Sequence, residues 1–222
     1  MKRCFIFAAG TFYGLREAPC AGDVTIAADA GLHNCRSAGI EPELVIGDFD
    51  SMAQPPRGGC VVAPVEKDDT DTMLAVREGL ARCCGEFYLY GGTGGVRLDH
   101  TLANWQTLAF LRRHGARGYL YDRDFVYTVL ENETLTLRRQ VEWGLVSLFA
   151  MSGTQQDVTL EGLQYPLAHA DVTGDFPIGV SNHFIADTAR ITCGSGLLLV
   201  GWQLPPLTET PADRSQAAPP AR

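Results

Sequence analysis

The sequence has no Cys-x-x-Cys pair and no long apolar run, and each absence argues against a class of protein. Its 222 residues include seven cysteines, an odd number without regular spacing, so neither a disulfide framework nor a zinc site is indicated. We therefore expect reduced, mostly buried thiols in a cytoplasmic protein. No apolar run approaches the roughly 20 residues of a membrane-spanning helix, which argues against a transmembrane segment.

Basic residues are also few. The 18 Lys and Arg are outnumbered by 26 Asp and Glu, and the formal net charge is −8. This surplus argues against binding to nucleic-acid phosphates or to an anionic membrane surface. Hydrophobic residues at 45% and charged residues at 20% are ordinary for a globular protein, so most of the chain should fold. The N-terminus resembles a short signal peptide, but Arg16 and Glu17 follow its apolar stretch, and we interpret residues 4–8 as a buried strand.

The first 120 or so residues alternate short apolar runs with helical patterns. We predict strands at residues 4–8, 24–28, 44–46, 61–65, 87–90 and 119–121. Helices are predicted at residues 31–38, 70–84 and 100–114. This alternation is typical of an α/β fold, in which a mostly parallel sheet carries helices on its faces.

After residue 122 the helical patterns end. We predict strands at residues 127–130, 133–138, 145–150, 157–161, 183–192 and 197–202, separated by turn residues. Such a series favours an antiparallel all-β sandwich or flattened barrel. The sequence therefore predicts an α/β domain over residues 1–123, a β-sandwich over 124–204, and a disordered, Pro- and Ala-rich tail over 205–222.

Acidic residues follow several predicted strands at the point where each strand ends. They are Asp29, Asp48, Asp50, Asp68, Asp69 and Asp71. One aspartate in such a place is usually a turn or capping residue, and Asp69 or Thr70 is suited to cap the next helix. Several carboxylates at one sheet edge repel one another unless they are protonated, paired or bound to cations. Because Mg²⁺ prefers such oxygen ligands and bridges them to phosphates, we predict a magnesium site here.

A glycine-rich loop at residues 91–95, Gly-Gly-Thr-Gly-Gly, follows the strand at 87–90 and precedes a helix. Its backbone N–H groups can approach an anion, although many such loops are only turns. The spacing fits neither a P-loop nor a dinucleotide fingerprint. Arg97, two residues before Asp99, suits a phosphate by its charge and planar shape, or makes only a surface ion pair. Acids facing such a loop predict chemistry on a magnesium-bound nucleotide.

Taken in order, these motifs resemble the thiamine pyrophosphokinase family. The resemblance rests on Ala28-Asp29-Ala30-Gly31, Gly47-Asp48-Phe49-Asp50-Ser51, Asp68-Asp69-Thr70-Asp71, and Arg97-Leu98-Asp99-His100 followed by Leu102-Ala103-Asn104. In the second half, Gly162-Leu163-Gln164-Tyr165-Pro166-Leu167 and Gly179-Val180-Ser181-Asn182 resemble the C-terminal motifs of the family. The match covers roughly residues 4–202.

The resemblance implies a Rossmann-like α/β catalytic domain that binds ATP and Mg²⁺, followed by a thiamine-binding β-sandwich. The implied activity is transfer of the pyrophosphoryl group of ATP to the hydroxyl of thiamine, giving thiamine diphosphate and AMP. Such enzymes are homodimers with the active site between subunits. By residue match, Mg²⁺ would be held by Asp48, Asp50 and Asp71, ATP would be bound by Asp29, Gly94, Gly95, Arg97 and Asp99, and thiamine by Tyr165, Ser181 and Asn182. Asp71 or Asp99 would accept the hydroxyl proton, so both count with Asp48 and Asp50 as catalytic candidates.

Two residues depart from the pattern of the family. Val96 lengthens the loop between Gly95 and Arg97, and His183 stands where an acidic residue commonly follows Ser-Asn. Two other functions stay open, a pyrophosphokinase for a hydroxymethyl-pterin and a nucleotide- or thiamine-binding sensor without turnover. The motifs at residues 162–167 and 179–182 favour thiamine, and the number of carboxylates argues against binding alone.

Overall fold

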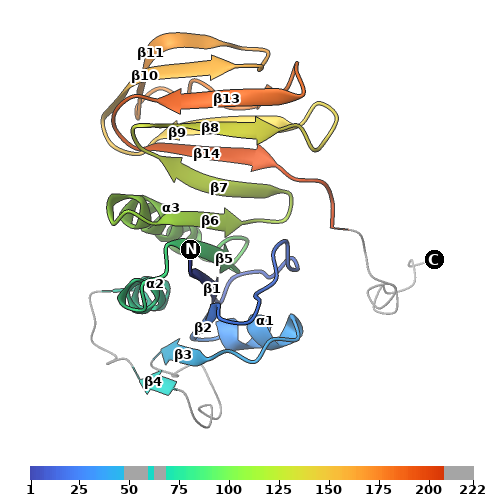
Figure 1. Cartoon of the computed structure of the whole chain (residues 1–222), viewed down its shortest axis with the longest axis vertical. Coiled ribbons are helices and arrows are strands. Elements are labelled where there is room, and N and C mark those ends of the chain that lie inside the picture. The colour runs from blue at the N-terminus through green and yellow to red at the C-terminus, as the bar shows by residue number, and fades with distance from the viewer. Residues whose placement is uncertain (48–59, 63–68, 208–222) are drawn as a thin grey trace, which may run out of the picture.

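A computed structural model describes residues 1–47, 60–62 and 69–207, with only the backbone described for residues 60–62. A ten-stranded mixed sheet runs through almost the whole length of the molecule, and a four-stranded sheet packs against one end of it (Figure 1). The predicted fold class, an α/β region followed by an antiparallel sandwich, is confirmed. No helix among the described residues is both long enough and apolar enough to cross a bilayer.

Six strands form the parallel part of the large sheet, in the order β6-β5-β1-β2-β3-β4. They are β1 (Arg3–Phe7), β2 (Val24–Ala28), β3 (Leu44–Gly47), β4 (Cys60–Val62), β5 (Glu86–Tyr90) and β6 (Arg117–Tyr121). The central strands are continuous apolar runs because both of their faces are covered, and Phe5, Ile6 and Phe7 are fully buried. These strands match their predicted positions within two residues at each end that the structure describes.

Three helices cover the two faces of this part of the sheet. On one face, α1 (Gly31–Ser37) packs against β1 and β2, with Leu32 and Cys35 in the core. On the other face, α2 (Asp71–Ala81) packs against β1, β2 and β3, and α3 (Leu98–Arg113) packs against β6 and β7 (Phe125–Leu130). The hydroxyl of Thr70 caps α2 by accepting from the N–H of Met73 at 3.2 Å, as the sequence allowed.

The antiparallel half shares the large sheet rather than forming a separate body. Strands β7, β14 (Leu198–Gln203), β9 (Leu145–Ala150) and β12 (Asn182–His183) extend it beyond β6. The second sheet consists of β11 (Leu167–Thr173), β10 (Thr154–Glu161), β13 (Thr188–Cys193) and β8 (Glu133–Arg138), in that order. Leu130, Leu148 and Ile191 belong to the buried core between the two sheets.

Two strand predictions in this half are wrong. The predicted strand at residues 183–192 is two strands, because the chain crosses from the large sheet at β12 to the second sheet at β13. Strand β11 was not predicted, because it is an exposed edge strand after Pro166 with little apolar alternation. Residues 208–222, most of the predicted tail, lie outside the described residues.

Candidate active site

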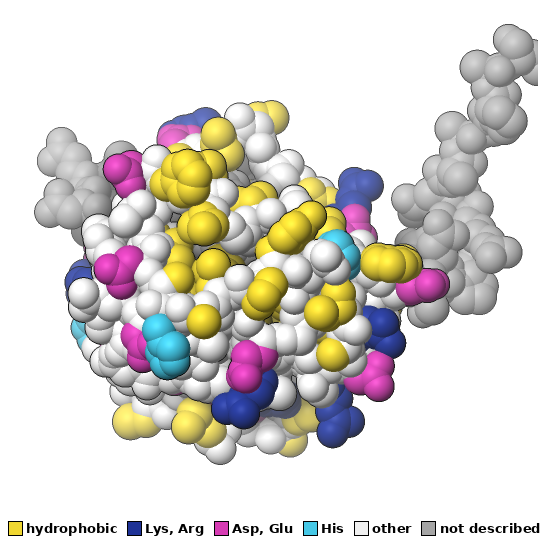
Figure 2. All heavy atoms as spheres, turned by 90° about the horizontal axis from the view of Figure 1, so that it is seen from above, with side chains coloured by type: hydrophobic (Ala, Val, Ile, Leu, Met, Phe, Trp, Pro, Cys, Tyr) yellow, Lys and Arg dark blue, Asp and Glu magenta, His cyan; other side chains and the backbone are white. Residues whose placement is uncertain are grey.

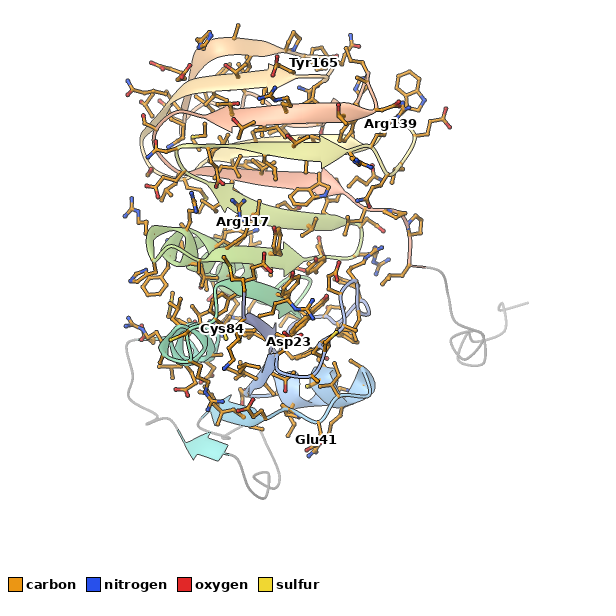
Figure 3. All side chains as sticks on the ribbon, viewed as in Figure 1. Asp23, Glu41, Cys84, Arg117, Arg139 and Tyr165 are labelled. Carbon is orange, nitrogen blue, oxygen red and sulfur yellow. The ribbon has the colours of Figure 1, made fainter. Side chains whose placement is uncertain are left out.

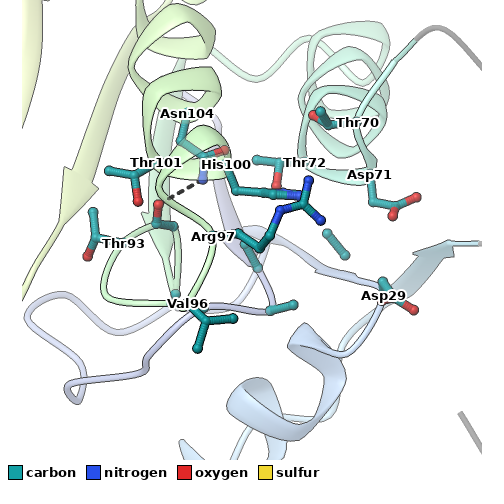
Figure 4. Close-up of a pocket in the computed structure, with 17 residues that line it drawn as sticks. Asp29, Thr70, Asp71, Thr72, Thr93, Val96, Arg97, His100, Thr101 and Asn104 are labelled. Carbon is teal, nitrogen blue, oxygen red and sulfur yellow. Dashed lines mark hydrogen bonds between the residues drawn. The ribbon is translucent and has the colours of Figure 1, made fainter. Parts of the chain in front are cut away.

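Four neighbouring parallel strands, β5, β1, β2 and β3, end along one edge of the large sheet. The chain passes from β1 to β2 on one side and later places β5 on the other side, so a topological switch point lies between β1 and β5. Ligands bind in open α/β sheets in the crevice at such a point. A cavity of about 250 Å³ lies here, and it draws on the segments that follow β1, β2 and β5 and on the first turns of α2 and α3 (Figure 4).

The floor of the cavity is built from backbone packed directly on backbone. A Cβ atom on Gly10 would lie 2.5 Å from the carbonyl oxygen of Gly91, and one on Gly91 would lie 2.3 Å from the carbonyl oxygen of Ala8. Gly91 also has a φ of 66°, in the left-handed region that favours glycine. Side chains are therefore excluded where the segments after β1 and β5 meet.

The glycine-rich loop carries backbone donors that the protein itself does not use. None of the N–H groups of residues 92–96 donates to an acceptor within the described part of the chain. The loop leads into the N-terminus of α3, where the helix dipole favours a negative charge. A phosphate group matches this set of donors.

Two of the predicted acids face this loop across the cavity. Asp29 follows β2 with a φ of 49°, and Asp71 is the first residue of α2. Figure 4 shows both carboxylates on one side of the cavity, with Arg97 and His100 on the other. Asp48, Asp50 and Asp68 lie outside the described residues. Within the described ranges, no three acidic, histidine or cysteine side chains form a metal-binding cluster.

Arg97 and Asp99 form an exposed ion pair with each other at the mouth of the cavity. The Nε of Arg97 donates to Oδ1 of Asp99 at 2.9 Å, and its terminal nitrogen donates to Oδ2 at 2.5 Å. These bonds from Arg97 lower the pKa of Asp99 to about 2, so Asp99 is a weak proton acceptor. Arg97 lines the cavity, whereas Asp99 and Gly94 do not.

Several lining residues had not been singled out from the sequence. They are Ala8, Ala9, Gly10, Thr72, Thr101, His100 and Asn104, the last two of which were quoted in a motif without a role. Residues 9 and 10 follow the strand predicted at 4–8, so the rule that was applied to the other strand ends would have found them. Val96 is fully exposed at the rim of the cavity.

The residues predicted to bind thiamine lie on the sandwich and away from this cavity. Figure 3 places Tyr165 at the opposite end of the molecule from α1 and β3. Asn182 is buried, and its amide accepts from the N–H of Tyr165 at 3.0 Å and donates to the carbonyl of Tyr165 at 2.7 Å. The ring of His183 lies 6.3 Å from that of Tyr165 and 5.5 Å from that of Trp143, between centroids. The structure therefore groups Tyr165, Ser181 and Asn182 with one another but not with the acids.

Comparison with known families decides the identity of this arrangement. Residues 20–120 match the model described as thiamin pyrophosphokinase, catalytic domain, and residues 132–198 match the thiamin pyrophosphokinase, vitamin B1 binding domain. The chain belongs to the thiamin pyrophosphokinase family. The catalytic match contains every residue of the cavity except residues 8–10, and the vitamin B1 match contains Tyr165, Ser181 and Asn182.

Individual relatives agree with this family. Thiamine pyrophosphokinase of Bacillus subtilis (strain 168) is 27% identical over an alignment of 182 positions, which covers 79% of this chain and 85% of that protein. The crystal structure of thiamin pyrophosphokinase from Geobacillus thermodenitrificans has a TM-score of 0.78 at 27% identity and covers 91% of this chain and 98% of that one. A family protein from Enterococcus faecalis has a TM-score of 0.76 at 26% identity, with 92% and 100% covered. The predicted activity, thiamine pyrophosphokinase, is confirmed, whereas neither alternative function is supported.

Proposed function

We propose that the cavity between β1 and β5 binds the phosphates of ATP and that the thiamine hydroxyl attacks the β-phosphorus there. The observation that supports this is one cavity in which Asp29 and Asp71 face Arg97 and a loop of unused N–H donors. The hydroxyl oxygen forms a bond to the β-phosphorus, and the bond from that phosphorus to the oxygen shared with the α-phosphate breaks. AMP leaves with that oxygen, and the hydroxyl proton passes to a carboxylate.

We assign the Mg²⁺ ligands to Asp48, Asp50 and Asp71, with Asp29 at the phosphate end. The donor set fits the metal, because Asp71 and Asp29 offer carboxylate oxygens at one wall of the cavity. Gly47, the residue before Asp48, lies against Asp29, and a Cβ on it would be 3.1 Å from the Cα of Asp29. When bound, Mg²⁺ supplies charge neutralisation and alignment for the phosphates.

The protein side chains divide the remaining work. Arg97 keeps its bonds to Asp99 through Nε and one terminal nitrogen, and offers its remaining donors to phosphate oxygens. Gly94, Gly95 and their neighbours donate backbone N–H groups to the same phosphates. Asp99 accepts two hydrogen bonds from Arg97, so we assign it to orienting that side chain, and Asp71, which lines the cavity as Asp99 does not, is left as the proton acceptor.

Thiamine is bound on the sandwich, with the Tyr165 ring stacked on one of its rings. Tyr165 is 64% exposed, and a flat cationic heterocycle favours an aromatic face. Ser181 is exposed beside Asn182 and has a φ of 58°, which is unusual for a serine. Because the Asn182 amide is bonded to the backbone of Tyr165, it holds the tyrosine in place.

A second copy of the chain brings the thiamine site to the cavity. Two separate apolar areas support a homodimer: Val96, Leu98 and Leu102 are exposed around the cavity, while Trp143, Tyr165, Phe176, Val180 and Ile185 are exposed on the sandwich. Figure 2 views the sandwich end and shows hydrophobic side chains gathered over a hollow there. Exposed apolar areas of this kind mark interaction surfaces.

The free cysteines support a cytoplasmic location, and the change of architecture along the chain supports two domains. The cysteines at positions 4, 20, 35, 83, 84 and 193 are all free, which suits a reducing cytoplasm. We place the catalytic domain at residues 1–123 and the thiamine-binding domain at 124–204, although β6 and β7 are paired across that boundary.

The test is to mix the protein with ATP, Mg²⁺ and thiamine and to measure thiamine diphosphate and AMP together. Equal amounts of both products, lost when EDTA removes Mg²⁺, are expected. ADP in place of AMP would contradict pyrophosphoryl transfer. Turnover with a hydroxymethyl-pterin but not with thiamine, or nucleotide binding without any turnover, would contradict the assignment to thiamine.

A further inference from the structure

Asn34 on α1 holds the segment that follows β1 without lining the cavity itself. Its side-chain Nδ2 donates to the carbonyl of Ala8 at 2.7 Å and to the carbonyl of Gly10 at 2.9 Å. Both amide hydrogens are therefore used. The opposite orientation of the amide would set its oxygen against two carbonyl oxygens, so these partners fix the orientation.

The segment held by Asn34 is bonded in turn to the glycine-rich loop. The N–H of Gly10 donates to the carbonyl of Gly91 at 2.7 Å, and the N–H of Thr11 donates to the carbonyl of Thr93 at 3.0 Å. The hydroxyl of Thr11 donates to the carbonyl of Gly94 at 2.6 Å. From the other side, Asn104 on α3 donates to the carbonyl of Gly92 at 2.8 Å.

Four consecutive carbonyls, those of residues 91–94, are thus all bonded to the protein. In a planar trans peptide, the C=O of one residue and the N–H of the next point in opposite directions. Fixing these carbonyls therefore directs the N–H groups of residues 92–95 away from those protein donors. This accounts for the four donors without an acceptor among the described residues.

We propose that Asn34 is a positioning residue for the phosphates of ATP. It fixes residues 8–11, whose hydrogen bonds to the carbonyls of Gly91, Thr93 and Gly94 aim the N–H groups of Gly92, Gly94 and Gly95 at the nucleotide. This rests on the proposed function of the cavity. An asparagine that only joined α1 to β1 would affect stability, but it would not affect ATP in preference to thiamine.

The first experiment replaces Asn34 and measures KM for ATP, KM for thiamine, and the affinity for α,β-methylene-ATP with Mg²⁺ by calorimetry below the melting temperature. Asn34→Ala removes both donors and Asn34→Asp sets a carboxylate against two carbonyl oxygens. We expect roughly tenfold weaker nucleotide binding for Ala and a larger loss for Asp, with KM for thiamine within about twofold. His33→Ala, an exposed neighbour on α1, is the matched control and should bind as wild type.

A second pair of variants keeps the test decisive if the Asn34 variants do not fold. Thr11 is exposed, so Thr11→Val removes only its hydroxyl bond to Gly94, and Thr11→Ser restores it. Val should weaken analogue binding about threefold, and Ser should recover it. Unchanged nucleotide affinity in folded variants, or equal losses for ATP and thiamine, would overturn the proposal. A wild-type protein that binds the analogue but forms no thiamine diphosphate would overturn the proposed function instead, and the binding measurements would still decide the role of Asn34.

Discussion

The cavity in the α/β half and the exposed end of the sandwich carry opposite kinds of side chain. The cavity brings Asp29, Asp71, Arg97 and His100 together within one chain, at the edge of a rigid sheet. The sandwich presents aromatic rings on an open surface, where Tyr165 is 64% exposed and Trp143 is 66% exposed. None of the described residues of the sandwich lines the cavity.

This difference indicates that one half is nearly complete by itself and the other is not. A site for a polyanion needs donors and charges fixed in place, which backbone packing supplies within a chain. A site for a flat heterocycle needs a second wall, because one exposed aromatic face leaves the ligand half in water. In the proposed homodimer, the sandwich would therefore gain most from the second copy of the chain.

The largest effect should come from Asp71→Asn, which removes the charge of a carboxylate without changing its size. We expect kcat to fall by about a thousandfold, because the cavity loses a ligand for Mg²⁺ and the assigned proton acceptor. Steady-state assays and thermal melts measure the effect. Glu78→Gln on the same helix, which loses only its surface bond to Arg82, is the control and should stay within about twofold. Wild-type turnover by Asp71→Asn would break the assignment of the cavity to catalysis.

Mixing subunits with different substitutions tests whether the cavity of one chain and the sandwich of another form one shared site. Asp71→Asn and Tyr165→Ala damage different halves, so a mixed dimer with shared sites contains one site with both changes and one with neither. At low thiamine, an equal mixture should recover about a quarter of the wild-type activity, since half of the dimers are mixed and each has one intact site. The control is a chain that carries both substitutions, which should recover nothing with either parent at the same low thiamine concentration. No recovery in mixtures shown to exchange subunits would place each site within one chain.

Much of the fold and part of the cavity could be predicted from the sequence, because both depend on local patterns. Buried parallel strands are continuous apolar runs, and the residues that follow them must meet at one sheet edge, which explains why Asp29, Asp71 and Arg97 lie together. The network that aims the glycine-rich loop was not predictable. Asn34 acts on carbonyls of residues more than 20 positions away, and nothing in the residues around it signals those partners.

The sandwich was predicted less well, because its strands also depend on contacts between residues far apart in the sequence. Only one residue of its edge strand β11 is buried, so the strand lacks the apolar alternation that identifies a strand. The break at residues 184–187 depends on which of two sheets each flanking strand joins, which is a long-range choice. The roles given to Tyr165 and Ser181 stay predictions, because the contacts within one chain do not test them.

Substitutions of Arg97 test whether the cavity binds ATP separately from thiamine. Arg97→Ala should raise KM for ATP by about thirtyfold and leave KM for thiamine nearly unchanged, because a charged donor to phosphate is lost. Arg97→Lys keeps the charge but not the planar pair of donors, so an intermediate value is expected. Initial rates with each substrate varied in turn measure both constants. A parallel rise in both KM values would contradict the assignment of Arg97 to the phosphates of the nucleotide.

The junction between the two halves should respond in stability rather than in substrate binding. Glu133 on β8 lies 3.2 Å from Arg112 of α3 and pairs with Arg117 of β6, near the middle of the molecule, where Figure 3 labels Arg117. All three side chains are mostly shielded from solvent, so Glu133→Gln should lower the free energy of unfolding by about 2 kcal/mol. Urea denaturation measures this. Glu41→Gln, which breaks the exposed pair with Arg36, is the control and should have no measurable effect.

The smallest effect, and one that depends on pH, is expected at Asp23. Burial opposes ionisation of its carboxyl, but hydrogen bonds from Arg3 and from the N–H of Cys20 outweigh it, and the pKa of Asp23 is lowered. A lowered pKa in the folded state means that the ionised carboxylate adds stability above the ordinary value of about 4, and that this contribution is lost as the pH falls below it. Asp23→Asn should therefore cost about 1 kcal/mol at pH 7 and progressively less between pH 4 and pH 2. Denaturation curves at several pH values test this, and a difference that stays constant down to pH 2 would show that the carboxylate charge is not the cause.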